Sequence, residues 1–180
     1  MVGGAFRRRL ELPDLLRLER VGPVLQARLR RTVEDARSLG GGRETSVRLC
    51  KGIYLEPEAI AFQDPDEIRE SFVEALDVFL DAGAYVAIAT HDEWLVEQSE
   101  RLVAERGLGR DDYEFQMLLG VRPALGHEFV RGGHRLRIYT PFGRHWYAYS
   151  LRRLQENPKI AGYIAADTVG RLLPGRNGSS

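Results

Sequence analysis

The feature that most constrains this chain is a regular alternation of short apolar runs with amphipathic segments, joined by short connections. Segments with apolar residues at helical spacing predict helices around residues 29–36, 65–81, 95–103 and 145–156, with residues 119–133 helical or irregular. The apolar runs predict five β-strands, at residues 24–27, 47–54, 84–90, 113–118 and 136–140. Strands that alternate with helices in this way predict an α/β fold built on a parallel sheet.

The second predicted helix has the clearest start signal. Asp64 stands at its N-cap, Pro65 at its first helical position, and Glu67 where it completes a capping box. Gly83 follows the last helical residues and marks the end. We therefore expect a helix over about residues 65–81.

Charge and cysteine content narrow the class of protein. The chain has 26 Lys and Arg residues against 26 Asp and Glu, so no net charge favours nucleic acid or an anionic membrane. Cys50 is the single cysteine, which rules out an internal disulfide and fits a reducing compartment. No apolar run approaches the roughly 20 residues that span a bilayer, and the first residues lack the apolar core of a secretion signal. We expect a cytoplasmic protein with no transmembrane segment and no nucleic-acid partner.

Polar residues interrupt strands that should be apolar. In a parallel α/β sheet, side chains at the carboxyl ends of the strands line the ligand site. Any one such residue is more often hydrogen-bonded structure than a ligand contact, but clusters on four strands favour a site. The residues concerned are Gln26, Arg48, Lys51, Thr90, His91, Glu114 and Gln116.

Arg48 and Lys51 form the sharpest pair of candidates. Buried cations need a partner, so they imply an anionic or electron-rich ligand, or a carboxylate such as Glu114. Gly52 follows directly and would let a flat ring or a phosphate approach the backbone. The alternative is a salt-bridged strand followed by a bulge glycine.

The segment from Thr90 to Asp92 ends the most apolar strand and begins a helix. Taken alone, it favours N-capping by Thr90 or Asp92, with His91 incidental. The functional alternative places His91 over a ligand, with the helix N-terminus favouring a phosphate.

The last predicted helix carries four polar residues on one face. This pattern supports two alternatives about equally. One is an ordinary ion pair between Arg152 and Glu156, and the other is an arginine pair that binds a carboxylate. The four residues are Tyr149, Arg152, Arg153 and Glu156.

Several familiar signatures are absent from the sequence. It contains no G-x-G-x-x-G after a strand, no P-loop, no G-x-S-x-G and no metal-spaced Cys/His cluster. A nucleotide bound in the Rossmann manner and a metal site are therefore not expected.

Five motifs, in order, resemble those of the proline dehydrogenase family. Residues 48–54 (R-L-C-K-G-I-Y) resemble its R-L-V-K-G-A-Y strand, and residues 89–92 (A-T-H-D) its A-T-H-N or A-T-H-D segment. Residues 114–120 (E-F-Q-M-L-L-G) resemble E-F-Q-M-L-x-G, and residues 137–154 resemble the final strand and its Y-x-x-R-R helix. Residues 24–27 match the family's V-L-Q-A strand, although Arg28 stands where tyrosine is common.

The resemblance implies a distorted (β/α)8 TIM-barrel-like fold that holds FAD at the carboxyl ends of the strands. The implied reaction is oxidation of L-proline to Δ1-pyrroline-5-carboxylate, the first step of proline catabolism, by hydride transfer to the flavin N5. It assigns catalytic roles to Arg48 and Tyr139, and substrate binding to Arg152, Arg153, Tyr149 and Leu118. It assigns cofactor contacts to Gln26, Arg48, Lys51, Gly52, Ile53, Thr90, His91, Asp92, Gln116 and Glu156.

The resemblance also implies a departure from the family, because only the last five or so of eight β/α units have counterparts here. We expect an irregular or helical segment at residues 1–20, a partial barrel at residues 21–165 and a disordered tail at residues 166–180. An open half-barrel exposes sheet edges, which predicts an oligomer or a partner chain that completes the barrel.

Two alternatives to a proline-oxidising enzyme stay open at this point. One is a truncated, non-catalytic flavin-binding remnant of the same family. The other is a barrel aldolase in which Lys51 forms a Schiff base. For the enzyme, the expected electron acceptor is a membrane quinone, with peripheral association at the inner membrane as the alternative to a purely cytoplasmic location.

Overall fold

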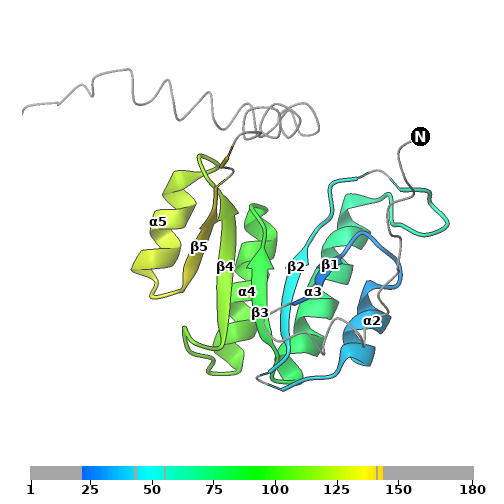
Figure 1. Ribbon diagram of the computed structural model, residues 1–180, viewed down its shortest axis with the longest axis horizontal. Coiled ribbons are helices and arrows are strands. Elements are labelled where there is room, and N and C mark those ends of the chain that lie inside the picture. Colours follow the sequence, from blue (N-terminus) through cyan, green and yellow to red (C-terminus); the bar gives the residue numbers. More distant parts are fainter. Residues whose placement is uncertain (1–21, 43, 55, 141, 144–180) are drawn as a thin grey trace, which may run out of the picture.

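The computed structural model describes residues 22–42, 44–54, 56–140 and 142–143. Within these residues five strands alternate with four helices, as the sequence pattern predicts (Figure 1). The strands are β1 (Val24–Gln26), β2 (Ser46–Cys50), β3 (Tyr85–Ala89), β4 (Tyr113–Leu118) and β5 (Leu136–Tyr139). The helices are α2 (Thr32–Leu39), α3 (Pro65–Asp81), α4 (Glu93–Glu105) and α5 (Pro123–Arg131).

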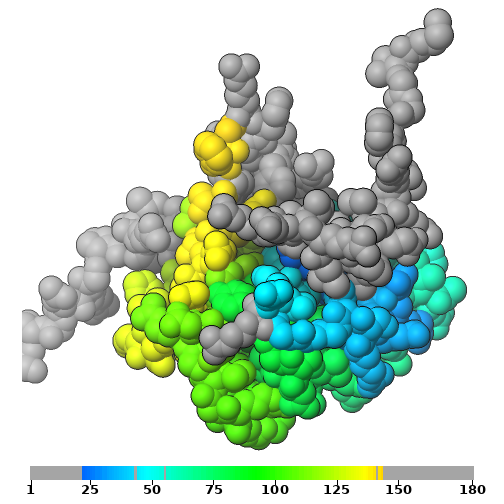
Figure 2. All heavy atoms as spheres, turned by 60° about the horizontal axis from the view of Figure 1, so that its bottom comes forward, coloured from blue at the N-terminus to red at the C-terminus, as the bar shows by residue number. Residues whose placement is uncertain are grey.

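The five strands form one parallel sheet in the order β1-β2-β3-β4-β5. Each strand lies beside its predecessor in the chain, and the same progression can be followed by colour in the space-filling view (Figure 2). Because parallel crossovers are right-handed, a sheet that always advances in one direction receives its helices on one side. A doubly wound sheet would instead reverse its strand order and carry helices on both sides.

Helix α3 begins as its sequence predicts. The Asp64 side chain accepts hydrogen bonds from the backbone N–H groups of Asp66 and Glu67, at 2.7 and 3.2 Å, and Pro65 opens the helix. The apolar face of α3 is buried in the core through Ile68, Phe72, Ala75, Leu76, Phe79 and Leu80.

Two element boundaries differ from the sequence expectation. Strand β2 ends at Cys50 rather than at residue 54, because Gly52 adopts a φ of +88°, which no strand residue adopts. The stretch that the sequence left as helical or irregular contains a regular helix, α5, with Pro123 in its first turn. The predicted segments 1–20, 145–156 and 166–180 lie outside the described residues.

The sheet has two chemically distinct faces. One face is apolar and belongs to the main core, together with the buried sides of α3 and α4; from the strands it contains Val47, Leu49, Val86, Ile88, Phe115 and Met117. The alternate residues point the other way. No described helix is long and apolar enough to cross a membrane.

Candidate functional site

The second face of the sheet, which we call the polar face, gathers most of the strand residues that the sequence marked as anomalous. Strand register pairs Arg48 with Ala87, which pairs with Glu114, and it pairs Cys50 with Ala89, which pairs with Gln116. We define the polar face by Gln26, Arg48, Cys50, Ala87, Ala89, Glu114, Gln116, Leu118, Arg137 and Tyr139. Residues from five strands thus share one side of the sheet, as a common site requires.

A chain of hydrogen bonds crosses this face from β2 to β5. Arg48 Nε donates to Gln116 Oε1 at 2.7 Å, and Gln116 Nε2 donates to Glu114 Oε1 at 2.7 Å. Arg137 then donates to both oxygens of the Glu114 carboxylate, at 2.7 and 2.9 Å. Of the alternatives that the sequence left open for Arg48 and Lys51, a pairing with Glu114 is not the one observed: the charged partner of Glu114 is Arg137.

Glu114 is the hub of this chain, since Tyr85 also donates its hydroxyl to the carboxylate at 3.1 Å. The residue is only 2% exposed. Burial alone would raise its pKa, but hydrogen bonds from Arg137, Gln116 and Tyr85 and the charge of Arg137 hold the pKa below its ordinary value. Glu114 is therefore a fixed negative charge and an acceptor of hydrogen bonds only.

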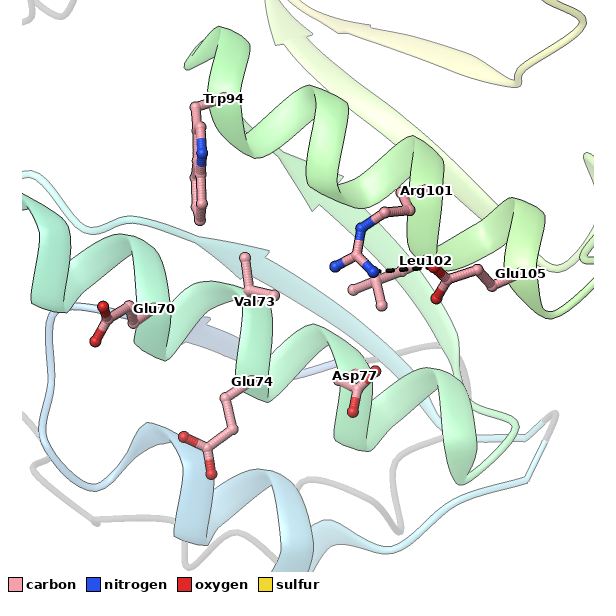
Figure 3. Close-up of a pocket in the computed structure, with 8 residues that line it drawn as sticks. All are labelled: Glu70, Val73, Glu74, Asp77, Trp94, Arg101, Leu102 and Glu105. Atoms are coloured by element: carbon pink, nitrogen blue, oxygen red, sulfur yellow. Dashed lines mark hydrogen bonds and ion pairs between the residues drawn. The ribbon is translucent and has the colours of Figure 1, made fainter.

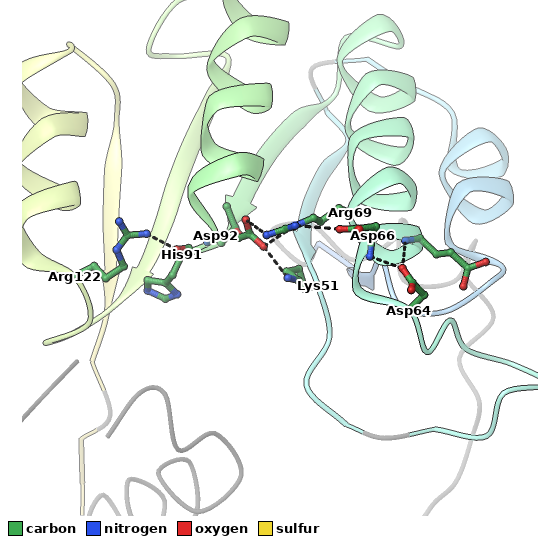
Figure 4. A network of polar contacts seen from close by, with 9 residues as sticks. Lys51, Asp64, Asp66, Arg69, His91, Asp92 and Arg122 are labelled. Carbon is green, nitrogen blue, oxygen red and sulfur yellow. Dashed lines mark hydrogen bonds and ion pairs between the residues drawn. The ribbon is translucent and has the colours of Figure 1, made fainter. Parts of the chain in front are cut away.

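A second cluster lies where β2 and β3 end, and Asp92 is its centre (Figure 4). Lys51 Nζ donates to Asp92 Oδ2 at 2.8 Å, and Arg69, from α3, donates through Nε and Nη2 to the two carboxylate oxygens at 3.0 and 3.2 Å. Burial opposes ionisation, but hydrogen bonds from Arg69 and Lys51 and their charges lower the pKa of Asp92 to about 2. One carboxylate thus joins the first turn of α4 to α3 and to the end of β2.

Asp92 occupies the N-cap position of α4, but its side chain makes no capping hydrogen bond. The cap that the sequence favoured for Asp92 is therefore wrong, because Lys51 and Arg69 engage the carboxylate instead. Thr90 Oγ1 accepts a hydrogen bond from the backbone N–H of Asp92, at 3.1 Å, and so orders the turn before the helix.

His91 has a structural contact of its own. Its Nε2 accepts a hydrogen bond from the backbone N–H of Leu118 at 3.1 Å, and Arg122 donates to its carbonyl at 2.8 Å. Burial and the nearby charge of Arg122 lower the pKa of the imidazole to about 4. His91 is therefore neutral at physiological pH, with its proton on Nδ1, and it ties the end of β3 to the end of β4.

Gly52, which lies beyond the end of β2, packs against Gln26, the last residue of β1. A Cβ atom built on Gly52 would stand 2.8 Å from Gln26 Oε1 and 3.3 Å from Arg28 Cβ, and the φ of +88° is itself unfavourable for other residues. The glycine is thus required by the packing of this turn. Ile53 follows it and is half-buried.

The structure places a predicted substrate-binding residue, Leu118, beside a predicted catalytic residue, Tyr139. Leu118 and Tyr139 are register partners at the ends of β4 and β5, on the polar face. The remaining candidates, Tyr149, Arg152, Arg153 and Glu156, lie outside the described residues.

The sequence reading missed three arginines that matter here. Arg69, Arg122 and Arg137 hold Asp92, the His91 carbonyl and Glu114 respectively. Each pairing joins elements distant in sequence, so no local spacing pattern reveals it.

A separate groove of about 410 Å³ runs between α3 and α4 (Figure 3). Its acidic side chains are largely neutralised, since Asp77 pairs with Arg106 and Glu105 with Arg101. It contains none of the site residues expected from the sequence; its lining is Glu70, Val73, Glu74, Asp77, Trp94, Arg101, Leu102 and Glu105. No group of three or more potential metal ligands occurs among the described residues.

Comparison with known sequences identifies a family. The family model described as proline dehydrogenase matches residues 4–166. The chain is 40% identical over 146 residues to proline dehydrogenase of Deinococcus radiodurans, covering 81% of this chain and 47% of the relative. It is 38% identical over 146 residues to proline dehydrogenase 1 of Bacillus subtilis strain 168, covering 81% and 48%. The chain thus spans about half the length of the curated relatives it matches.

Comparison with solved structures addresses the fold alone. Proline utilization A from Bdellovibrio bacteriovorus matches with a TM-score of 0.69 and 23% identity, over 93% of this chain and 22% of that one. A proline utilization A mutant from Bradyrhizobium japonicum matches with a TM-score of 0.66 and 22% identity, over 87% and 18%. The expected α/β fold of an incomplete TIM-barrel-like sheet is therefore confirmed, with five parallel strands and four connecting helices in the described residues.

Proposed function

Because the chain belongs to the proline dehydrogenase family, we propose that it takes part in FAD-dependent oxidation of L-proline to Δ1-pyrroline-5-carboxylate. The polar face of the sheet is the proposed site. Its neighbours at the carboxyl ends of the strands, Lys51 to Ile53 and Thr90 to Asp92, extend that site toward the rest of the cofactor.

The observation that carries this proposal is the environment of Arg48. Its guanidinium bonds to the neutral amide of Gln116, whereas Glu114 is engaged by Arg137. No carboxylate of the described residues lies within ion-pair distance of Arg48. A half-buried cation without a counter-ion is costly, so it favours a ligand that brings an electron-rich or negative group.

The residues present suit an isoalloxazine ring. Such a ring offers hydrogen-bond acceptors and donors at its edge, which Arg48, Gln116 and Gln26 can complement, and a flat face that Ala87 and Ala89 leave room for. When bound, FAD would accept the hydride that leaves proline. Toward the rest of the cofactor we assign Lys51, Gly52, Ile53, Thr90, His91, Asp92 and Glu156.

Within this proposal the protein binds and orients the cofactor and the substrate, and it supplies positive charge to the site. A guanidinium group only donates hydrogen bonds, so Arg48 can stabilise negative charge but is not assigned the role of a base. Leu118 and Tyr139, adjacent at the strand ends, would wall the proline ring, together with Tyr149. Arg152 and Arg153 would hold the carboxylate of proline, for which paired guanidinium groups are well shaped.

Two alternatives differ from this proposal in the reaction they imply. An aldolase would use Lys51 as a nucleophile, but its ion pair with Asp92 would first have to break. A non-catalytic remnant would bind flavin through the same residues without oxidising proline. The electron acceptor in our proposal is a membrane quinone, reached by peripheral association at the inner membrane.

The test is an absorbance spectrum of the purified chain with FAD, recorded before and after anaerobic addition of L-proline. We expect FAD to bind and its absorbance to bleach with proline, and to return when a soluble quinone is added. The Arg48→Gln variant should lose both binding and bleaching. Arg37→Gln is the matched control, because Arg37 lies on the surface and pairs with Glu74.

The possible outcomes distinguish the proposed enzyme from the two alternatives. Bound flavin that stays oxidised with proline would identify the non-catalytic remnant. Failure of the folded chain to bind FAD, or equal binding by Arg48→Gln, would refute the proposed site. Trapping of Lys51 by borohydride with a carbonyl substrate would favour the aldolase.

A further inference from the structure

The buried carboxylate of Glu114 has no role in the proposed contacts with flavin or proline, yet three side chains donate hydrogen bonds to it. Arg137, Gln116 and Tyr85 all donate to it, and it lies below Gln116 on the same strand and the same face. Two residues apart on a strand, their side chains are neighbours on that face.

The orientation of the Gln116 amide depends on this carboxylate. A glutamine amide can present either its oxygen or its NH2 group in a given direction, and its neighbours decide which. Since an ionised carboxylate only accepts hydrogen bonds, Glu114 must face the NH2 group of Gln116. The amide oxygen is then directed away from Glu114, and Arg48 Nε donates to that oxygen.

The path between Arg48 and Gln116 passes over β3. Neighbouring strands lie about 4.8 Å apart, so β2 and β4 are separated by roughly 10 Å. On this face β3 carries Tyr85, which bonds to Glu114, and then Ala87 and Ala89, whose small side chains leave room for Arg48 to reach across. The contact is therefore built into three adjacent strands.

We propose that Glu114 is a positioning residue of the site, which fixes the Gln116 amide and through it the guanidinium of Arg48. This inference rests on the proposed function, because it is the flavin that Arg48 would meet. Glu114 touches neither flavin nor proline in this scheme. It keeps Arg48, which bonds to a neutral amide, aimed into the site.

The test compares Glu114→Gln with the wild-type chain by two measurements. The first is NMR hydrogen exchange of the Arg48 Nε–H, assigned by its disappearance in Arg48→Lys and followed without any flavin. We expect exchange to accelerate about tenfold or more, because the hydrogen bond is no longer held. The second is FAD affinity, for which we expect a loss of about tenfold. Glu74→Gln is the matched control, because it removes a carboxylate of a surface pair.

A double-mutant cycle separates positioning from a general loss of stability. If Glu114 acts through Gln116, then Glu114→Gln adds nothing to Arg48 exchange in a Gln116→Leu background. Additive effects would overturn the proposal, and so would unchanged Arg48 exchange in Glu114→Gln. Gln116→Leu also serves if Glu114→Gln fails to fold, since unchanged Arg48 exchange in that variant equally refutes the relay.

The two proposals fail in different ways. If the wild-type chain does not bind FAD, the proposed function fails, while the flavin-free exchange measurement still decides whether Glu114 positions Arg48. If FAD binds and Arg48 exchange is insensitive to Glu114→Gln, only the positioning role is refuted.

Discussion

Asp92→Asn is the substitution whose effect on stability follows most directly from the geometry. The carboxylate is 12% exposed and joins Lys51 and Arg69, which are each 35% exposed. The change removes the charge but keeps the shape of the side chain. Because both cations reach water, they can be rehydrated when the carboxylate is lost, so no buried charge is left without solvent.

The magnitude comes from the pKa of Asp92, which falls from 3.8 to about 2 in the folded chain. At 1.36 kcal/mol for each pKa unit, the ionised carboxylate stabilises the folded state by about 2 kcal/mol. Since the folded pKa is the lower one, this stabilisation is present in full above pH 3.8 and is lost as the pH falls toward about 2. Asp92→Asn should therefore lower the free energy of unfolding by about 2 kcal/mol at neutral pH, and by less below about pH 4.

The assay is urea denaturation of both proteins across this pH range. Asp66→Asn is the matched control, because Asp66 contacts the same Arg69 at 3.1 Å but is 79% exposed. An exposed pair contributes little, and we expect the control to change stability by at most about 0.5 kcal/mol. The reasoning is refuted if Asp92→Asn matches its control at neutral pH, or if its deficit stays constant into the acid range.

Three other predictions concern the turn, the core and the histidine. Gly52→Ala should destabilise the chain by about 1–3 kcal/mol in urea denaturation, because of the positive φ and the contact with Gln26; wild-type stability would contradict the described turn. Phe129→Ala should cost about 3–5 kcal/mol in the same assay, since Phe129 stacks on Phe115 at 4.1 Å in the core, and a loss below about 1 kcal/mol would refute that packing. His91, with its pKa near 4, should show no titration by NMR between pH 5 and 8 and should carry its proton on Nδ1. Its lowered pKa makes the stability of the fold fall as the pH drops from about 6.5 toward 4. An NMR titration midpoint near 6.5 would disprove the burial of His91.

The fold was predictable from the sequence because periodicity and helix caps are local signals. The capping residues at Asp64 and the apolar spacing of α3 specify a helix without any tertiary information. The end of β2 was not predictable in the same way, because the composition of residues 51–54 is compatible with continuation of the strand. The chain leaves the strand there because Gly52 turns against Gln26 of β1, a contact between segments distant in sequence.

Which residues lie at the site was predictable, but not how they pair. Alternation along a strand and the parallel arrangement place Arg48, Glu114 and Gln116 on one face. Their partners depend on the register between strands and on which side chains are long enough to meet. Arg137, on the strand next to Glu114, makes a two-pronged contact with the carboxylate, whereas Arg48, two strands away, donates to Gln116 instead.

This division of partners decides where positive charge remains available to a ligand. From sequence, Arg48 and Lys51 are equivalent cations near the end of one strand. In the structure Lys51 shares a carboxylate with Arg69, and Arg137 is matched by Glu114, but Arg48 faces a neutral amide. A charge that is solvated by an amide keeps most of its field, while an ion pair cancels much of it. The polar face therefore presents its unbalanced charge at Arg48, above the small side chains of Ala87 and Ala89, where an electron-rich planar group gains the most from binding.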